Sequence, residues 1–422
     1  MTLRRISPGA VTGTARAPPS KSYTHRALIV GHLARRSFRV RNPLDSDDTR
    51  ATAAALSRLG TSVVRTPDVW TVGPPSHRSS LSRVRLDCRE SGTTLRFITA
   101  VAAVSGRPVE IDGSSRLSDR PIDELLSALR SLGAHCRHVG GTGFPIEIQG
   151  PMRGGPVSLD ASRSSQFASA LLLTLPTLEE DSSIDLQGSV VSEPYLDATL
   201  AVLAHHAVHV ERQGRHLRVR GGQRFRGSSF LVPGDASSAA YLWAAAAVGG
   251  GTVRVKGLSA MWPQADLAVL DLLEATGAVV SRHPDGASVS AGPRRPFRVN
   301  LTRAPDLYPL AGALAATSPG KSRITGARHV ALKESDRRSE TARLARGLGA
   351  RVSSTHSGLV IEGRPRPRAL HLPHLSDHRL VMSAAVAALA AEGPSVVGDA
   401  RAVRKSFPGF WGALESLSAE VR

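Results

Sequence analysis

The chain repeats itself at an almost constant interval. Six short polar motifs, each of which opens a helix-like apolar run, start at Lys21, Gly92, Ser164, Asp235, Asp306 and Asp377. The steps between them are 71, 72, 71, 71 and 71 residues. A period that regular indicates six copies of one structural unit, so a fold prediction has to begin with it. The N-terminus of a helix offers unpaired N–H groups and partial positive charge, so the six starts are also candidate anion sites.

Length and charge narrow the choice of architecture and ligand. A chain of 422 residues exceeds what one hydrophobic core usually supports, so six units divide naturally into two domains of three. The 54 Lys and Arg residues against 35 Asp and Glu residues give a formal charge of +19. That excess favours anionic partners such as phosphorylated metabolites or nucleic acid, although a basic, arginine-rich proteome with a solvated surface explains it equally well.

The remaining bulk features predict a cytoplasmic protein. Cys88 and Cys136 are the only cysteines, too few for a disulfide scaffold, which fits a reducing compartment. No apolar run approaches the length of a membrane span. The stretch from Met1 to Ile6 lacks the apolar core of a secretory signal.

Each unit is read as helix, helix and strands. In the first unit, Ser20 and Lys21 lead into an apolar run, and a second helix begins near Ser46 with acidic residues in its first turn. That helix ends at Gly60, and Val63 begins a strand. The first helices are apolar nearly all round and are therefore predicted to be buried. This alternation predicts an α/β (α+β) fold and excludes an all-helical solenoid.

Charged side chains gather at the predicted helix starts. Lys21, Ser22 and Arg26 lie in the first turns of one helix, where a lysine, a hydroxyl and an arginine at a positive helix end predict a phosphate or carboxylate site. A solvated basic helix start is the plainer alternative. Arg120 precedes a proline at another start, and Gly92 would let a ligand approach the backbone closely.

The densest charge cluster runs from Lys333 to Arg337 and includes Glu334. Lys333 and Arg337 are spaced i and i+4, which on a surface helix usually makes an ion-paired, solvated face. Asp306 opens the preceding helix, however, and Arg379 lies at the start of the next one. Acids mixed with Lys and Arg at one place are what proton transfer on an anionic substrate requires.

A metal site is not expected. His371, His374 and His378 have a spacing that can bind zinc, but Pro373 interrupts the run and no cysteine stands near it.

Taken together, the motifs resemble the 5-enolpyruvylshikimate-3-phosphate synthase family of enolpyruvyl transferases. The matching motifs follow one another in order over essentially the whole chain: Pro19 to Ser22 with Arg26, Leu44 to Asp48, Ser91 to Arg96, Arg120 with Pro121, Ser164 to Gln166, Gly234 to Ser238, Lys333 to Arg337, Asp377 to Arg379, and Lys405 to Pro408. Any one of these motifs alone is weak evidence for the family, but nine motifs in the same order are specific to it.

The resemblance implies a two-domain enolpyruvyl-transferase fold of six βαβαββ-type repeats, three per domain around buried parallel helices. Mapped onto this chain, residues 20–233 form the domain of repeats 1 to 3, on the shikimate 3-phosphate side. Residues 1–19 and 234–422 form a discontinuous domain of repeats 4 to 6, on the acid-base side.

The resemblance also implies a reaction, in which the carboxyvinyl group of phosphoenolpyruvate passes to the 5-hydroxyl of shikimate 3-phosphate and phosphate is released. This is a step of the shikimate pathway to chorismate and the aromatic amino acids. By motif match, the residues that hold shikimate 3-phosphate are Lys21, Ser22, Arg26, Ser164, Ser165, Gln166, Ser192, Tyr195, Asp306 and Lys333. Those that hold phosphoenolpyruvate are Lys21, Gly92, Arg120, Gln166, Arg337, Arg379 and Lys405.

Three residues are expected to be catalytic: Asp306 as the base that takes the hydroxyl proton, Glu334 as the acid that protonates the methylene carbon, and Lys21. No metal and no organic cofactor is expected, and the family resemblance suggests a monomer whose partners are the two small substrates, without nucleic acid or membrane. Glu90 and His329 depart from the commoner family pattern, which has Asn at both places, and Asp235 has no expected role beyond that of a helix cap.

Two rival functions are weighed. UDP-N-acetylglucosamine enolpyruvyl transferases share the fold and chemistry but usually carry a reactive cysteine on the loop before the Arg-Pro motif, and the loop from Gly113 to Asp119 has none. A basic RNA-binding protein resembling RNA 3'-terminal phosphate cyclase would have a related unit. The chain's 4% aromatic residues argue against it, because nucleic-acid platforms use clustered aromatics for stacking.

Overall fold

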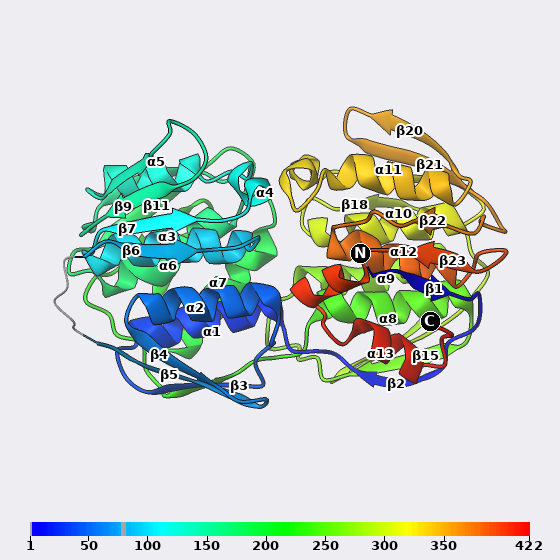
Figure 1. Ribbon diagram of the computed structural model, residues 1–422, viewed down its shortest axis with the longest axis horizontal. Helices are drawn as coiled ribbons and strands as arrows, with labels where there is room; N and C mark the ends of the chain where they lie inside the picture. The colour runs from blue at the N-terminus through cyan, green and yellow to red at the C-terminus, as the bar shows by residue number, and fades with distance from the viewer. Residues whose placement is uncertain (1, 77–81) are drawn as a thin grey trace. The chain divides into compact units, whose positions relative to one another are not determined.

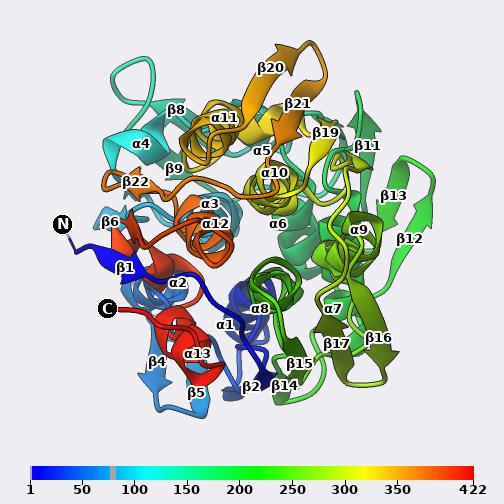
Figure 2. The same cartoon turned by 90° about the vertical axis from the view of Figure 1, so that its right-hand side faces the viewer.

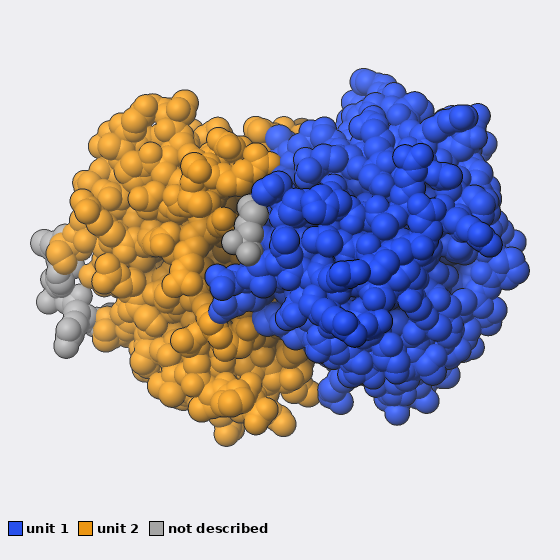
Figure 3. All heavy atoms as spheres, turned by 45° about the vertical axis from the view of Figure 1, so that its right-hand side comes forward, with its two compact units in different colours: residues 1–18, 233–422 blue, residues 19–232 orange. Residues whose placement is uncertain are grey.

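The chain folds into two compact units. The computed structural model describes residues 2–76 and 82–422, so Met1, which the expected domain of residues 1–19 includes, lies outside the described residues. Unit 1 comprises Met1–Pro18 and Pro233–Arg422, and unit 2 comprises Pro19–Val232 (Figure 3). Each unit is described by itself below.

Unit 2 contains three copies of one α/β pattern (Figure 1). The first copy consists of α1 (Lys21–Leu33), β3 (Phe38–Arg41), α2 (Asp47–Arg58), β4 (Thr61–Arg65) and β5 (Val69–Pro75). The second consists of β6 (Val84–Asp87), α3 (Gly92–Ser105), β7 (Val109–Asp112), α4 (Ser115–Ser118), α5 (Asp123–Ser131), β8 (His135–His138) and β9 (Ile146–Gln149). The third consists of β10 (Pro156–Asp160), α6 (Gln166–Thr174), η1 (Leu175–Thr177), β11 (Ser182–Gln187), α7 (Glu193–His205), β12 (Val210–Gln213) and β13 (His216–Val219).

Unit 1 repeats the pattern with one shortened copy. Its first copy consists of α8 (Ala236–Gly249), β15 (Thr252–Lys256), η2 (Ala265–Ala268), α9 (Val269–Thr276), β16 (Val279–His283) and β17 (Gly286–Ser290). The second consists of β18 (Arg298–Asn300), η3 (Pro305–Leu307), α10 (Tyr308–Thr317), β19 (Gly320–Thr325), η4 (Arg328–Leu332), α11 (Arg337–Gly347), β20 (Arg351–Thr355) and β21 (Gly358–Gly363). The third consists of β22 (His371–Leu372), α12 (His378–Ala388), β23 (Ser395–Val397), η5 (Ala400–Lys405) and α13 (Phe410–Ser416).

Two strands join sheets that the sequence order alone would not assign to them. Strand β2 (Gly13–Arg16) directly precedes α1 but pairs parallel with β15 in unit 1. Strand β14 (Ser229–Leu231) directly precedes α8 but pairs parallel with β3 in unit 2. The chain passes from one unit to the other at these two places. Each of the two strands is the edge strand of a four-stranded sheet.

All four-stranded sheets share one topology, a parallel pair followed by antiparallel strands, as in the order β6-β7-β9-β8. In the part of the chain that the structure describes, the sixth sheet has three strands: β1 (Arg4–Ile6) pairs antiparallel with β23, and β23 pairs parallel with β22. Where the parallel strands are consecutive, as β6 and β7 are, a helix returns the chain to the same end of the sheet before the second strand begins.

The first helix of each copy is buried, as its composition predicts. In α8 every residue from Ser238 to Val248 is buried, and α12 is buried along its whole length. Figure 2 shows α8, α10 and α12 end-on within unit 1, with β15, β17, β19 and β21 farther out. Side-chain caps fix where these helices start: Ser91 accepts from the backbone N–H of Thr94, Asp235 from Ser238 and Asp377 from Arg379. Asp235 is therefore the helix cap that the sequence suggested.

Candidate functional site

Lys21, expected to contact both substrates, opens α1 in unit 2. Its Nζ lies 2.9 Å from Oδ2 of Asp48, which stands in the first turn of α2. The hydroxyl of Thr94 in α3 donates to the backbone carbonyl of Asp48 over 3.2 Å and also contacts Thr52 Oγ1 at 2.7 Å. These bonds bring the starts of three helices together and hold the lysine ammonium at that place.

Arg26 lies one turn along α1 and is 2% exposed. Its guanidinium donates to Thr199 Oγ1 at 2.9 Å and to the backbone carbonyls of Ser22 at 2.9 Å and Tyr195 at 2.8 Å. Burial lowers the pKa of Arg26 to about 10, so the side chain stays charged at neutral pH. None of these three acceptors is a carboxylate, so none of them neutralises the positive charge of Arg26. Arg26 thus holds Ser22 and Tyr195, two other predicted substrate residues, in place.

Gly92 opens α3 directly beneath two arginines. A Cβ atom at this position would lie 2.3 Å from Nη1 of Arg96 and 2.6 Å from the guanidinium carbon of Arg120. Arg96 donates from Nη1 to the Gly92 carbonyl at 3.0 Å and from Nη2 to the Pro121 carbonyl at 2.5 Å. Glycine is therefore required by the close approach of the two guanidinium groups, which the sequence-based argument about ligand access did not foresee. The helix start and both arginines favour an anion here.

The third helix start of unit 2 is lined by neutral polar groups. Gln166 donates from Nε2 to Thr93 Oγ1 over 3.1 Å, which joins the starts of α6 and α3. Ser164 Oγ accepts from the Gln166 backbone N–H at 3.2 Å, and Ser165 is buried. Ser192 caps α7 with φ of 54°, a left-handed conformation that costs free energy in a residue other than glycine. Such strain is often kept where a side chain must be aimed at a ligand.

In unit 1, Arg337 holds three carboxylates at once. Its Nε donates to Asp377 Oδ2 at 2.8 Å, its Nη1 to Asp306 Oδ1 at 2.8 Å and its Nη2 to Glu334 Oε2 at 2.7 Å. The side chain is 1% exposed, and although burial alone would lower the pKa of Arg337, the three acids raise it above its usual value. The guanidinium thus fixes the relative positions of Asp306 and Glu334, the two predicted acid-base groups.

Asp306 also accepts from Arg379 Nη2 at 2.6 Å and lies 3.7 Å from Lys333 Nζ. Burial by itself would raise the pKa of Asp306, but Arg379, Lys333 and Arg337 outweigh it and hold the pKa well below its usual range. An anion that drew these cations away would raise the proton affinity of Asp306.

One alternative weighed for this cluster, an ion-paired i, i+4 face on a surface helix, does not hold. Helix α11 begins at Arg337, with Asp336 as its cap, so Lys333 precedes the helix and the cluster lies at a helix start. Lys333 and Arg337 both form ion pairs with Asp306, because the chain turns between η4 and α11 and directs the two side chains to this carboxylate.

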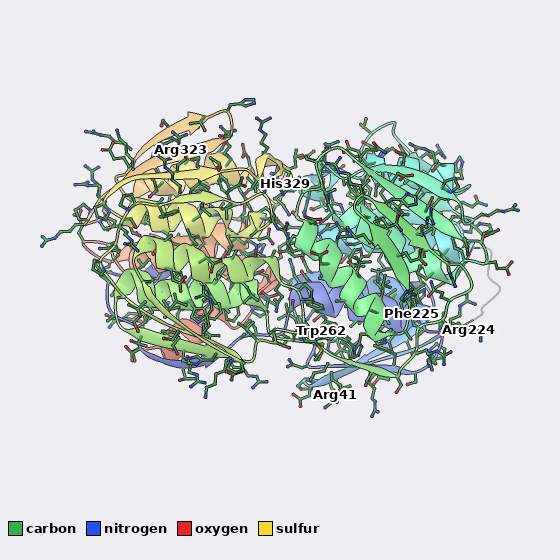
Figure 4. All side chains as sticks on the ribbon, turned by 180° about the vertical axis from the view of Figure 1, so that it is seen from behind. Arg41, Arg224, Phe225, Trp262, Arg323 and His329 are labelled. Atoms are coloured by element: carbon green, nitrogen blue, oxygen red, sulfur yellow. The ribbon has the colours of Figure 1, made fainter. Side chains whose placement is uncertain are left out.

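His329 lies on η4 and Lys405 on η5, both in unit 1. His329, labelled in Figure 4, is 7% exposed, and burial first and then Lys333 lower its pKa to about 3, so its imidazole is neutral. A neutral imidazole can donate and accept one hydrogen bond each, which resembles the amide that the family commonly has there. Lys405 ends η5 and is 9% exposed.

Three acidic residues of these clusters were not in the predicted site set. Asp48 and Asp377 belonged to recognised motifs, but Asp48 was read as an ordinary first-turn acid and Asp377 as an ordinary helix start. Their second role, as anchors for Lys21 and Arg337, depends on residues 27 and 40 positions away. Asp266, on η2, carried no signal at all, because an acid in a first turn normally faces water.

Neither a metal cluster nor a membrane helix is found in residues 2–76 and 82–422. No group of three or more His, Cys, Asp or Glu side chains there could hold a metal ion. None of the helices in this part of the chain is both long and apolar enough to cross a membrane.

The sequence matches the family model described as EPSP synthase (3-phosphoshikimate 1-carboxyvinyltransferase) over residues 6–414. The chain belongs to the EPSP synthase family. A 3-phosphoshikimate 1-carboxyvinyltransferase of Methanoculleus marisnigri is 41% identical over 418 residues, which cover 98% of this chain and 99% of the relative. One from Thermococcus kodakarensis is 41% identical over 409 residues, or 96% and 98% of the two chains. Members of this family are transferases, as the motifs predicted.

The fold agrees with that of a solved EPSP synthase. A structure of EPSP synthase from Acinetobacter baumannii superposes with a TM-score of 0.81 at 24% identity and covers 100% of both chains. The mixed α/β enolpyruvyl-transferase fold expected from the sequence is thereby confirmed.

Proposed function

We propose that this chain transfers the carboxyvinyl group of phosphoenolpyruvate to the 5-hydroxyl of shikimate 3-phosphate, releasing phosphate, and that the two units are its two functional domains. The observation that carries the proposal most directly is the joining of Asp306 and Glu334 by the single guanidinium of Arg337. Two carboxylates held beside Arg379 and Lys333 provide acid-base groups and anion-binding groups at one place. Family membership supplies the substrates.

Substrate binding falls to groups of both units. Lys21, Ser22, Arg26, Ser164, Ser165, Gln166, Ser192 and Tyr195 of unit 2, with Asp306 and Lys333 of unit 1, serve shikimate 3-phosphate. Gly92, Arg120, Lys21 and Gln166, with Arg337, Arg379 and Lys405, serve phosphoenolpyruvate. Both substrates are multiply anionic, so helix starts that carry Lys and Arg side chains suit them.

Asp306 takes the proton of the 5-hydroxyl as its oxygen attacks the central carbon of phosphoenolpyruvate. Free Asp306 is a weak base because three cations depress its pKa. When the carboxylate and phosphate of phosphoenolpyruvate engage Arg379 and Arg337, these cations have a competing anion and Asp306 becomes more basic. The base is thus activated by the substrate that it serves.

Glu334 delivers a proton to the methylene carbon, which gives a tetrahedral adduct, and removes one when the adduct loses phosphate. Its carboxylate is held 2.7 Å from Arg337 Nη2, which fixes its position. Lys21, Arg120 and Arg337 stabilise the negative charge of the adduct and of the leaving phosphate. The chemistry proceeds through these side chains and requires no cofactor.

We further propose that the enzyme acts in the cytoplasm as a monomer. Cys88 and Cys136 are both free and buried, which fits a reducing compartment. Light scattering at micromolar concentration would test the monomer, and a dimer mass would overturn it.

A phosphate-release assay tests the function directly. Phosphate should form from phosphoenolpyruvate only when shikimate 3-phosphate is present, with the enolpyruvyl product identified by mass spectrometry. Release with UDP-N-acetylglucosamine alone would make the chain a nucleotide-sugar enzyme instead. Tight, salt-sensitive RNA binding without phosphate release would support the RNA-binding alternative.

A further inference from the structure

His25 is a buried histidine that the proposed mechanism does not use. It lies on α1, one turn after Lys21, and is 0% exposed. Its Nδ1 lies 2.8 Å from Thr52 Oγ1 on α2. Its Nε2 is also buried and has no hydrogen-bond partner in the part of the chain that the structure describes. A buried ring with only one of its two nitrogens partnered needs an explanation.

Two contacts, one helical turn apart, join α1 to α2. The two helices lie side by side in unit 2 (Figure 1). The first contact is the ion pair of Lys21 with Asp48, and the second is that of His25 with Thr52. The two residues on each helix are four positions apart, so they lie on the same helix face. The contact of His25 therefore fixes the spacing of the two helices next to Lys21.

Thr94 of α3 connects both contacts to a third helix. Its Oγ1 lies 2.7 Å from Thr52 Oγ1. The same hydroxyl donates to Ser91 Oγ over 2.7 Å and to the Asp48 carbonyl over 3.2 Å. Ser91 in turn caps α3 by accepting from the backbone N–H of Thr94. A continuous chain of contacts thus runs from His25 through the two threonines to the starts of α2 and α3.

The acceptors at the end of this chain fix where each hydrogen lies. A threonine hydroxyl has one hydrogen, and Thr94 directs its own to Ser91 Oγ and the Asp48 carbonyl. None is left for Thr52, so the contact between the two threonines uses the hydrogen of Thr52. Thr52 then has only lone pairs to offer His25. The hydrogen between these two side chains therefore belongs to Nδ1 of the histidine.

The other ring nitrogen of His25 leads to the same tautomer. With the hydrogen on Nδ1, the buried Nε2 carries only a lone pair. With the hydrogen on Nε2, the ring would bury an N–H group that has no acceptor among the described residues, which is costly. Burial lowers the pKa of His25 to about 3, although Asp48 acts against it, so the ring is neutral at physiological pH.

We propose that His25, as the neutral tautomer with its hydrogen on Nδ1, is a positioning residue that holds the ammonium of Lys21 in place through this chain. The inference rests on the proposed function, in which Lys21 contacts both substrates. Without the His25 donor, the two threonines lose the bond that orients them. The Lys21 ammonium and its partner Asp48 can then shift together, away from the place where the substrates bind.

Nitrogen-15 NMR of protein labelled at histidine tests the tautomer without substrate. The ring signals that disappear in His25→Leu should be those of a histidine with a protonated Nδ1 and a bare Nε2. They should stay unchanged between about pH 5 and pH 9, because the ring is neutral throughout that range. A ring protonated at Nε2, or one that gains a second proton in this range, would overturn the inference even if transferase activity is found.

Substitutions at His25 test its effect on catalysis. His25→Leu removes the donor and keeps a side chain of similar size. The KM for each substrate should rise about tenfold, the usual cost of one buried hydrogen bond, while kcat falls by a smaller factor. In His25→Asn an amide N–H can donate from near the place of Nδ1, so both constants should return to within about twofold of the wild type.

His32 provides the matched control on the same helix. It is buried about 16 Å along α1 from Lys21, and its Nδ1 lies 2.6 Å from Thr61 Oγ1. His32→Leu thus loses the same kind of bond at a place remote from the lysine. Both leucine variants should lower Tm by similar amounts, but only His25→Leu should change KM. Equal effects on KM, or a His25→Leu variant with lowered Tm and unchanged KM, would show a merely structural residue and overturn the proposal.

A double variant tests whether His25 acts through Thr52. Thr52→Val removes the hydroxyl with little change of shape and should also raise the KM for each substrate. Because the two side chains act through one bond, adding His25→Leu should make Thr52→Val no worse. Effects that multiply would mean that the two residues act independently, against the proposal. The expected tautomer in a protein that releases no phosphate would refute the proposed function and, with it, the kinetic role of His25.

Discussion

The helix starts of the two units handle charge differently. In unit 2, Arg26 and Arg96 donate to hydroxyl and backbone oxygens, and the ammonium of Lys21 is paired with one acid, Asp48. In unit 1, Arg337 alone is bonded to three acids. The acceptors of Arg26 are uncharged, so they do not neutralise its positive charge. The cations of unit 1 can bind a ligand only by being shared with carboxylates, whose proton affinity changes as a result. The difference suggests that unit 2 mainly binds and unit 1 mainly transfers protons.

The largest expected effect is that of Asp306→Asn, which removes the base from unit 1. Turnover should fall about 10²–10⁴-fold, the usual worth of general acid-base catalysis. Shikimate 3-phosphate affinity, measured by calorimetry, should change only slightly, because unit 2 supplies most of the binding groups. Glu334→Gln should behave alike. Near-normal turnover in either variant would break the division between the units.

A smaller effect is expected where unit 2 binds the anion. Gly92→Ala places a Cβ 2.3 Å from Arg96 Nη1, so both arginines above the helix start must shift. The KM for phosphoenolpyruvate should rise about tenfold while kcat changes less, because misplaced binding groups cost affinity before they cost chemistry.

Gly412→Ala is the matched control for this substitution. A Cβ at Gly412, within α13, meets nothing within 4 Å, so this variant should keep wild-type kinetics and gain a little helix stability. Equal kinetics for Gly92→Ala and the wild type would mean that the anion does not bind at this helix start.

Substitutions at Asp48 test whether this acid of unit 2 affects substrate binding through its negative charge or by holding Lys21 in position. Asp48→Asn keeps an oxygen for Lys21 but removes the negative charge, so the KM for shikimate 3-phosphate should fall about threefold. Asp48→Ala also removes the acceptor, which lets the ammonium move, so the KM should rise by a similar factor. If both variants shift the KM in the same direction, the pair acts through only one of these properties.

The smallest expected effect is a change in the stability of the fold, and it comes from Asp266 in unit 1. The raised pKa of Asp266 means that protonation favours the folded state, so this stability is complete below the ordinary value of 3.8 and is lost as pH rises through about 6. Asp266→Asn cannot ionise, so its Tm should exceed that of the wild type by about 2–4 °C at pH 8.

The same comparison at pH 4 provides the control, since Asp266 is then neutral in the wild type and the two Tm values should agree. The difference in Tm between Asp266→Asn and the wild type is compared at the two pH values. If this difference is more negative at pH 8 than at pH 4, ionised Asp266 stabilises the fold.

The sequence predicted the parts of this protein that depend on local signals. The period located all six helix starts, and the caps and apolar runs predicted the buried helices. It could not predict which starts meet, because the bond from Arg379 to Asp306 spans 73 residues and lies between repeats. Nor could it distinguish Asp266 from a solvated first-turn acid, since burial depends on how η2 packs on α8. The spacing of Lys333 and Arg337 alone could not distinguish a solvated helix face from a helix start, because the two differ only in where α11 begins.

The way in which the chain passes twice between the units has a consequence for engineering. Backbone bonds in both directions join Arg5 to Arg422, at 2.7 and 2.8 Å, so the two ends of the chain lie side by side. A short linker could close them, and the chain could be reopened between Pro18 and Pro19, at the boundary of the units. In that circular permutant each unit would be one uninterrupted stretch, and β1 and β2 would be synthesised after the strands with which they pair rather than hundreds of residues before them.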